Sequence, residues 1–222
     1  ALEGLEGTPV VLSVEAEPFS SATDTRAAAA WVASLDSSHL ELCLDCCHSA
    51  VEFEEAGEAL ALTRSSGLGK VQFSSALSLM NPADNPDGVR ALLSMDEPRF
   101  LHQVTSSDPQ TRAADISDLA RALEKGSCWR EQAEWRCHFH VPVDLKRYEG
   151  LGTTTAHADD LVGGLLSQPT MWSHEELHLE IETYTWSVLP EASGGSEGLT
   201  DALAREYAHV MGLLSDAGWE PE

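Results

Sequence analysis

The chain has 222 residues, of which 42% are hydrophobic, so it is long enough to bury a sizeable core within one domain spanning residues 1–222. Its 37 acidic and 13 basic side chains give a formal net charge of −24. A surface this acidic repels phosphate backbones and anionic lipids, which disfavours nucleic-acid and membrane-surface partners. No apolar run approaches the roughly 20 residues of a membrane span, so direct membrane insertion is not expected either.

The five cysteines favour a reducing compartment over a disulfide framework. Their number is odd, and three of them lie within residues 43–47. The spacing Cys43-x-x-Cys46-Cys47 could supply thiolates to a zinc ion. A structural zinc site normally needs four ligands, however, and the other two cysteines lie far along the chain. We therefore expect buried free thiols and a cytoplasmic location.

Short apolar runs alternate with longer helical stretches along most of the chain. Pro18 ends the first run, and Thr23 or Asp24 provides an N-cap for the helix that follows. The pattern predicts strands over 10–17, 40–45, 70–76 and 178–185, and helices over 24–35, 54–65 and 199–214, the last with an apolar stripe of Leu203, Tyr207, Val210 and Leu214. Such alternation predicts an α/β fold in which helices cover a sheet of parallel strands.

The alternation is interrupted between the third and the last of these strands. Residues 78–136 carry turn signals at Asn81-Pro82 and at 85–88, and they contain two expected helices, near 88–95 and 111–124. This stretch is too long for an ordinary connection. We therefore expect an insertion that lies over the strand ends, within the same domain.

Groups suited to binding a metal lie at or near the ends of strand-like runs. Asp45-x-x-His48 places a carboxylate at a strand end and an imidazole one turn later. An Asp45 that only N-caps the next helix fits the same pattern. In His138-Phe139-His140 the two imidazoles share one face of an extended segment, and Phe139 faces the other. Two hydrogen-bonded core histidines would produce the same spacing.

Carboxylates of the last predicted strand complete the pattern. Glu180 and Glu182 share one face, whereas Leu179 and Ile181 share the other. Carboxylates are rarely buried unless they are paired or bind a metal, so several that converge need a cation. Glu17, at the end of the first strand, is a further candidate, although a surface glutamate fits that position equally well. Mixed oxygen and nitrogen ligands suit a divalent ion such as zinc or manganese.

Several segments resemble one protein family. Residues 42–48 (LCLDCCH) are similar to a strand end of the xylose isomerase-like TIM barrels. Across nearly the whole chain the resemblance is closer to the metabolite traffic protein EboE family, through 70–77 (KVQFSSAL), 97–103 (EPRFLHQ), 137–142 (CHFHVP), 151–154 (LGTT) and 178–186 (HLEIETYTW), in this order. The resemblance implies a (β/α)8 TIM barrel with a divalent-metal site at its C-terminal face. It also implies an association with the movement of a secondary metabolite or its precursor.

The resemblance further implies which residues form the site. The superfamily pattern, carried over residue by residue, makes metal ligands of Glu17, Asp45, His48 and Glu182. His138 and His140 stand where some members carry an Asp-x-His pair of ligands. Gln72 stands where a ligand histidine is common, which favours one or two ions over three. The side chains expected to contact the metabolite are Gln72, His102, Tyr184 and Trp186.

Four predicted strands cannot close a barrel of eight. The chain resembles the C-terminal half of a family member, because it begins with a linker that runs into what should be a mid-barrel strand. We therefore expect it to cover about half of the barrel plus the insertion. Roughly 150 or more residues would come from a missing N-terminal part or from a partner chain.

Two classes of function compete. The first is a metal-dependent enzyme, either an isomerase/epimerase or a hydrolase, that acts on a small polar metabolite with Glu180 or a nearby carboxylate as general base. The second is a non-catalytic binding or carrier protein that retains the metal site for ligand capture. A purely structural metal is a third reading. The sequence names neither the substrate nor the metal, because fold alone does not fix function.

Overall fold

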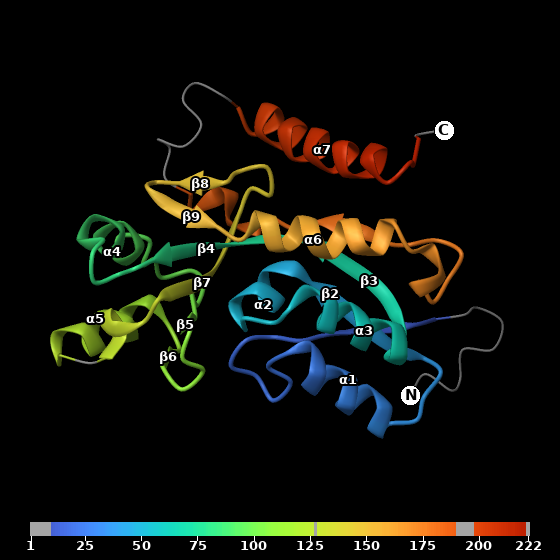
Figure 1. The fold of residues 1–222 in the computed structure, drawn as a ribbon, viewed down its shortest axis with the longest axis horizontal. Coiled ribbons are helices and arrows are strands. Elements are labelled where there is room, and N and C mark those ends of the chain that lie inside the picture. The colour runs from blue at the N-terminus through green and yellow to red at the C-terminus, as the bar shows by residue number, and fades with distance from the viewer. Residues whose placement is uncertain (1–9, 127, 190–197, 221–222) are drawn as a thin grey trace.

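Four parallel strands form the first of two sheets in this computed structural model, which describes residues 10–126, 128–189 and 198–220 (Figure 1). Their order is β1-β2-β3-β10, so β3 joins segments that are far apart in the sequence. The strands are β1 (Leu12–Glu15), β2 (Leu40–Asp45), β3 (Leu68–Phe73) and β10 (Leu179–Ile181). All four carboxyl ends therefore lie at one edge of this sheet.

Helices cover one face of the parallel sheet. Leu44, Val71 and Phe73 point into a core that they share with apolar residues of four of the helices. The residues that alternate with them, such as Asp45 and Gln72, point to the opposite, polar face. The helices nearest this sheet are α1 (Thr25–Ser34), α2 (Cys46–Val51), α3 (Ala56–Ser66), α6 (Thr155–Leu166) and α7 (Leu199–Asp216).

The second sheet has six strands, and each of them runs antiparallel to its neighbours. Its order is β6-β5-β7-β4-β9-β8, and it lies beside the first sheet, with α4 and α5 on its outer side (Figure 1). Its elements are β4 (Ser75–Met80), α4 (Pro86–Leu93), β5 (Val104–Ser106), β6 (Arg112–Ala113), α5 (Ile116–Glu124), β7 (Glu134–Val141), β8 (Arg147–Tyr148) and β9 (Leu151–Thr153). Short 3-10 helices follow at η1 (Cys128–Glu131), η2 (Pro169–Met171) and η3 (Tyr184–Ser187).

Ser74 marks the point at which the chain leaves one sheet for the other. The run 70–76, predicted as a single strand, is the end of β3 followed by the start of β4. The Ser74 hydroxyl donates to the Asp45 carboxylate at 2.9 Å, which ties this crossing to the end of β2. Ser75 is paired with Val141 at the end of β7. This connection therefore brings the end of β7 next to the carboxyl ends of the parallel strands.

The closing helix packs differently from the prediction. Its core-facing residues are Ala202, Glu206 and Val210, whereas Leu203 and Tyr207 are exposed. The Glu206 carboxylate is fully buried. It accepts hydrogen bonds from the Val143 amide, at 3.1 Å, and from the Thr183 hydroxyl. Of the predicted apolar stripe, Val210 and Leu214 pack on the core, whereas Leu203 and Tyr207 face solvent and Glu206 is buried in their place.

The α/β class, the parallel sheet and the helical cover are confirmed. Within the part of the chain that the structure describes, the strands form two open sheets and no closed barrel. The predicted insertion, 78–136, is part of an antiparallel sheet that begins at Ser75 and ends at Thr153. None of the helices in the described ranges combines the length and apolar character that a membrane crossing requires.

Candidate metal centre

Carboxylates and imidazoles from five segments meet at the carboxyl ends of the parallel strands. Glu15 and Asp45 are the last residues of β1 and β2, and Glu182 follows the last residue of β10. Parallel strands end at one edge of their sheet, which brings these acidic side chains close together. The imidazoles come from the first turn of α2, at His48, and from β7, at His138 and His140.

The three imidazoles face one another through their Nε2 atoms. Nε2 of His138 lies 2.9 Å from Nε2 of His48 and 3.2 Å from Nε2 of His140. The alternation predicted for β7 places Phe139 on the other side, in the core of the antiparallel sheet. Two imidazole nitrogens bound to one tetrahedral zinc ion lie about 3.3 Å apart, because each zinc–nitrogen bond is about 2.0–2.1 Å long. The spacing between the histidines therefore suits a shared ion.

The Nδ1 atom of each ring lies against an oxygen that accepts its proton. Nδ1 of His48 is 2.7 Å from the Ala16 carbonyl oxygen, and Nδ1 of His140 is 2.9 Å from the carbonyl oxygen of Glu182. Nδ1 of His138 is 2.7 Å from Oε1 of Gln103. A carbonyl oxygen can only accept, so each Nδ1 is protonated and a neutral ring keeps its lone pair on Nε2. This is the tautomer that binds metals through Nε2.

The surrounding carboxylates favour a positive charge at the three imidazoles. The pKa of His48 is raised to about 10, because Asp45, Glu15 and Glu17 outweigh the burial that would lower it. Burial lowers the pKa of His138, and the neighbouring imidazoles lower it further. The charge at neutral pH is therefore held by His48, whose Nε2 proton can be donated to His138. A metal cation would supply the same charge to all three rings.

A second group of oxygens lies beside the imidazoles. Ligand atoms of Glu15, Asp45 and Glu182 lie within 4.8 Å of one another. Burial, together with the Asp45 charge, raises the pKa of Glu182 to about 8. Oε2 of Glu182 is buried and accepts no hydrogen bond from the described residues. A buried carboxylate oxygen without a donor is costly, so it fits a site that a cation completes.

The residues present fit a divalent metal, and several combinations of them meet the distance requirement. Three combinations join imidazole nitrogens to oxygen or sulfur donors of the kind that zinc accepts, and the fourth offers carboxylate oxygens alone, which suit manganese. The sets whose ligand atoms lie within 4.8 Å are Glu17, His48 and His138; Asp45, His48 and His140; Cys47, His138 and His140; and Glu15, Asp45 and Glu182. The clusters therefore could hold a metal ion, and each of the six predicted ligands belongs to at least one of these sets.

The cluster opens into a pocket of about 440 Å³. The ring of Tyr184 contacts that of His140, with centroids 4.5 Å apart, and forms part of its wall. The lining residues are Glu15, Glu17, His48, Arg99, Phe100, Leu101, Gln103, His138, His140, Glu182 and Tyr184. A small molecule in this pocket would therefore contact the side chains that could hold a metal.

Three of the four residues expected to contact a metabolite lie outside the pocket lining. Gln72 is buried on the polar face of the sheet and accepts a hydrogen bond from the Cys43 thiol at 2.8 Å. His102 is buried behind β7, where Nδ1 lies 3.0 Å from the carbonyl oxygen of His138. Trp186 lies in η3, outside the pocket lining. Of the four residues, Tyr184 alone lines the pocket.

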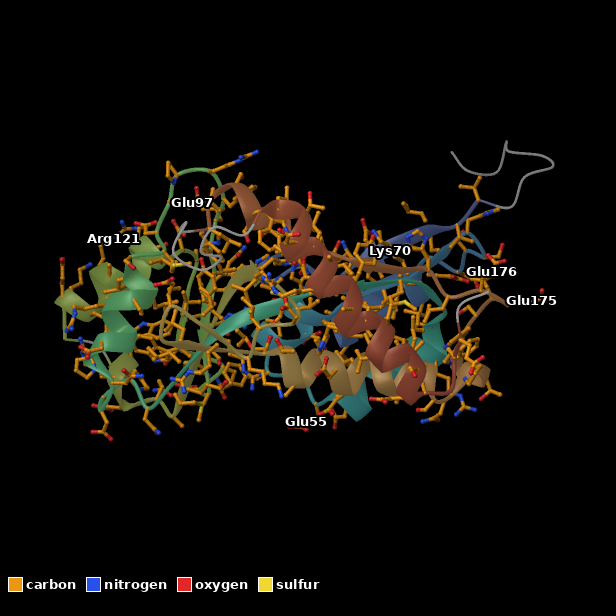
Figure 2. All side chains as sticks on the ribbon, turned by 90° about the horizontal axis from the view of Figure 1, so that it is seen from above. Glu55, Lys70, Glu97, Arg121, Glu175 and Glu176 are labelled. Atoms are coloured by element: carbon orange, nitrogen blue, oxygen red, sulfur yellow. The ribbon has the colours of Figure 1, made fainter. Side chains whose placement is uncertain are left out.

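Glu180 also lies outside the pocket lining. Its carboxylate forms an ion pair with Lys70, which sits in the N-terminal half of β3. Lys70 and Glu97, which belongs to the segment at the pocket, lie well apart along the long axis of the molecule (Figure 2). Glu180 and Glu182 share the polar face, as predicted from the alternation, but only Glu182 reaches the strand ends.

Four residues of the site were not predicted. Glu15 lies two residues before Glu17, so both share one face of the first predicted strand. This spacing could have identified Glu15 from the sequence. Cys47 was set aside with the other thiols, yet its Sγ lies within 4.8 Å of ligand atoms of both β7 histidines. Gln103 orients His138, and Arg99 lines the pocket. Only the folded sheet brings these last two to the site, so spacing could not find them.

Comparisons with models of known protein families, with curated proteins and with solved structures find no match to this chain.

Proposed function

We propose that this chain forms the divalent-metal-dependent part of a protein that acts on a small polar metabolite. The observation that carries the proposal is the convergence of His48, His138 and His140 on one point. Their Nδ1 atoms are all held by carbonyl or amide oxygens, and their Nε2 atoms are directed toward one another. Hydrogen bonds between core histidines would also bring Nε2 atoms together, but the buried Oε2 of Glu182 beside them, which has no partner among the described residues, favours a cation.

The ligands proposed for the metal are Asp45, His48, His138, His140 and Glu182, which leaves Glu17, the sixth predicted ligand, free to transfer a proton. A divalent ion such as zinc or manganese, when bound, polarises a carbonyl group or lowers the pKa of a water molecule. The pocket beside the cluster admits a small ligand, and its walls combine carboxylates with the aromatic side chains Phe100 and Tyr184. This combination supports isomerase/epimerase or hydrolase chemistry on a polar metabolite.

The family proposal rests on the resemblance alone. The segments 42–48, 137–142 and 178–186, which carry it, all contribute to the candidate centre. A parallel sheet with helices on one face and polar residues on the other is what part of a xylose isomerase-like TIM barrel would provide. We accordingly propose a role in secondary-metabolite traffic, with the remainder of a barrel supplied by further N-terminal residues or a partner chain. The free cysteines agree with a cytoplasmic setting.

One observation favours the alternative of a non-catalytic metabolite-binding or carrier protein. Glu180, expected from the sequence to transfer the proton, pairs with Lys70 outside the pocket lining. An enzyme would therefore need a different carboxylate, one that lines the pocket, as its general base. Glu17 lines the pocket and its carboxylate lies 3.6 Å from ring nitrogens of His48 and His138. We therefore propose Glu17 as the proton-transfer group in the enzyme.

Paired glutamine variants separate the enzyme from the carrier. We expect Glu17→Gln to lower turnover by about 10²-fold or more, because the amide cannot take a proton. Glu180→Gln should keep turnover within a few fold of the parent protein. The assay is a screen of small keto and hydroxy compounds, with metal content measured in every sample. An equal loss in both variants would contradict the assignment of Glu17, and turnover of no compound by the metal-loaded parent would favour the carrier.

A further inference from the structure

Residues 99–101 form one wall of the pocket, and the carboxylate of Glu97 organises the segment that carries them. Oε2 of Glu97 accepts a hydrogen bond from the Arg99 amide at 2.7 Å, and Oε1 accepts one from the Phe100 amide at 2.9 Å. Oε1 also lies 3.0 Å from Nε2 of His102, whose other ring nitrogen contacts the carbonyl oxygen of His138. The wall is therefore fastened to the strand that carries two of the candidate ligands.

Arg99 is the one cationic side chain other than histidine in the pocket lining. Acidic side chains outnumber basic ones by 37 to 13 in this chain, so carboxylate partners for arginine are plentiful. Six arginines have such a partner: Arg26, Arg90, Arg112, Arg121, Arg136 and Arg205. Within the described ranges no carboxylate forms an ion pair with Arg99. The charge of its guanidinium group is therefore available to a group that is not a carboxylate of these residues.

Neutral groups hold the Arg99 side chain in place. Its Nη1 donates a hydrogen bond to the Ser187 hydroxyl at 2.7 Å. Its guanidinium carbon lies 5.2 Å from the centroid of the Phe100 ring, a cation–π distance. The Phe100 ring in turn contacts that of Tyr184, with centroids 4.9 Å apart. The charge is thus positioned at the pocket by partners that do not neutralise it.

We propose that Arg99 binds an oxyanion, a carboxylate or phosphate group, of the metabolite whose other end lies at the histidine cluster. The inference deepens the proposed function and rests on it for the position of the reacting end. A guanidinium group presents parallel N–H donors that match such oxyanions. Phe100, Leu101 and Tyr184 would contact the carbon chain between the two ends. The substrate class is therefore a small organic acid or phosphate ester.

The charge of the pocket explains why this contact would decide specificity. Glu15, Glu17 and Glu182 line the same pocket and repel an anion. An anionic ligand can then enter only where cations compensate, namely at the metal and at Arg99. A neutral polyol of the same size would gain little from the guanidinium group. Arg99 therefore favours acids over neutral metabolites.

The test measures anion binding in zinc-loaded and metal-free protein, with inorganic phosphate and acetate as separate probes. We expect Arg99→Gln to weaken binding of at least one probe about tenfold, and Arg99→Lys to weaken it less, because charge remains but the planar fork is lost. The control is Arg90→Gln, which removes an exposed arginine of α4 outside the pocket lining and should leave binding unchanged. The stronger probe identifies the anion as phosphate or carboxylate.

Equal affinity in the parent and in Arg99→Gln, or no measurable binding of either probe, would overturn the inference. Zinc content is recorded for each sample, so a failure of the metal site is recognised separately. A protein that binds no zinc but binds the anion through Arg99 would refute the proposed metal-dependent function and leave the anion site standing. A protein that binds zinc, but whose anion binding does not depend on Arg99, would refute the anion site and leave the metal-dependent function standing.

Discussion

Replacing His138 by alanine is expected to lower the affinity for zinc by about 10²-fold or more. Nε2 of His138 lies within 3.2 Å of Nε2 of both other imidazoles, so it is central to the candidate centre. The substitution removes one of the three imidazole ligands, the one that lies between His48 and His140. Competition against a chromophoric chelator measures the affinity, and circular dichroism shows whether the fold is retained.

The matched control for this substitution is His174→Ala. His174 is a half-exposed histidine that pairs with Glu41 at 2.8 Å, outside the pocket lining. It removes the same side chain from a surface position, where an ion pair contributes little. Zinc affinity should be unchanged in this variant. A similar loss of affinity in both variants would show that zinc binds elsewhere on the acidic surface.

Phe139→Ala is expected to destabilise the protein by about 3–5 kcal/mol, which is typical of removing a fully buried aromatic ring. Phe139 is fully buried in the core of the antiparallel sheet, and its ring stacks on that of His102 with centroids 4.3 Å apart. The cavity would lie directly behind His138 and His140, so the variant should also bind zinc more weakly. Urea unfolding monitored by fluorescence gives the free energy of unfolding.

Met80→Ala serves as the comparison within the same sheet. Met80 lies at the end of β4 with 54% of its surface exposed, so truncation should cost less than about 1 kcal/mol. A cost for Phe139→Ala no larger than that of Met80→Ala would mean that Phe139 is not packed in the core. The alternation of β7, on which the orientation of both histidines depends, would then be wrong.

The alternation in the sequence was enough to predict which side chains share a face. His138 and His140 flank a core phenylalanine in β7, and the end of β2 carries Asp45, as expected from period-two spacing. Asp45 caps α2 through the His48 amide, at 2.7 Å, so the N-cap reading of Asp45-x-x-His48 is confirmed, and the same carboxylate lies where it could bind a metal. Local periodicity determines these features, and it is visible in a single sequence.

The antiparallel sheet could not be predicted in this way. Strands β5, β6, β8 and β9 have only two or three residues each, too few to show a period. Their pairing depends on contacts between distant segments, such as that of Leu77 with Cys137 and with Thr153. Helix α6 was missed as well, although its buried face carries Ala158, Leu161, Val162 and Leu165. Two adjacent glycines in its second half weaken the helical signal.

The remaining differences between the prediction and the structure concern tertiary position. The spacing in 178–186 placed Glu180, Tyr184 and Trp186 with the site, but β10 ends at Ile181 and the chain turns into a 3-10 helix. The turn keeps Tyr184 at the pocket and leaves Trp186 outside its lining. His102, expected to contact the metabolite, lies behind β7 and is held there by Glu97, a contact that the sequence does not show. Such anchors are visible only in the folded chain.

Elemental analysis of the purified protein, before and after dialysis against a chelator, tests the central claim most directly. The account predicts about one or two divalent ions per chain, bound through the histidine cluster and absent from His138→Ala. Removal should lower the melting temperature, because ligand atoms of Glu15, Asp45 and Glu182 then lie within 4.8 Å of one another with no cation between them, and Glu182 has to take up a proton. Protein that contains no metal, takes up none on addition of zinc or manganese, and melts at the same temperature with and without chelator would contradict the account.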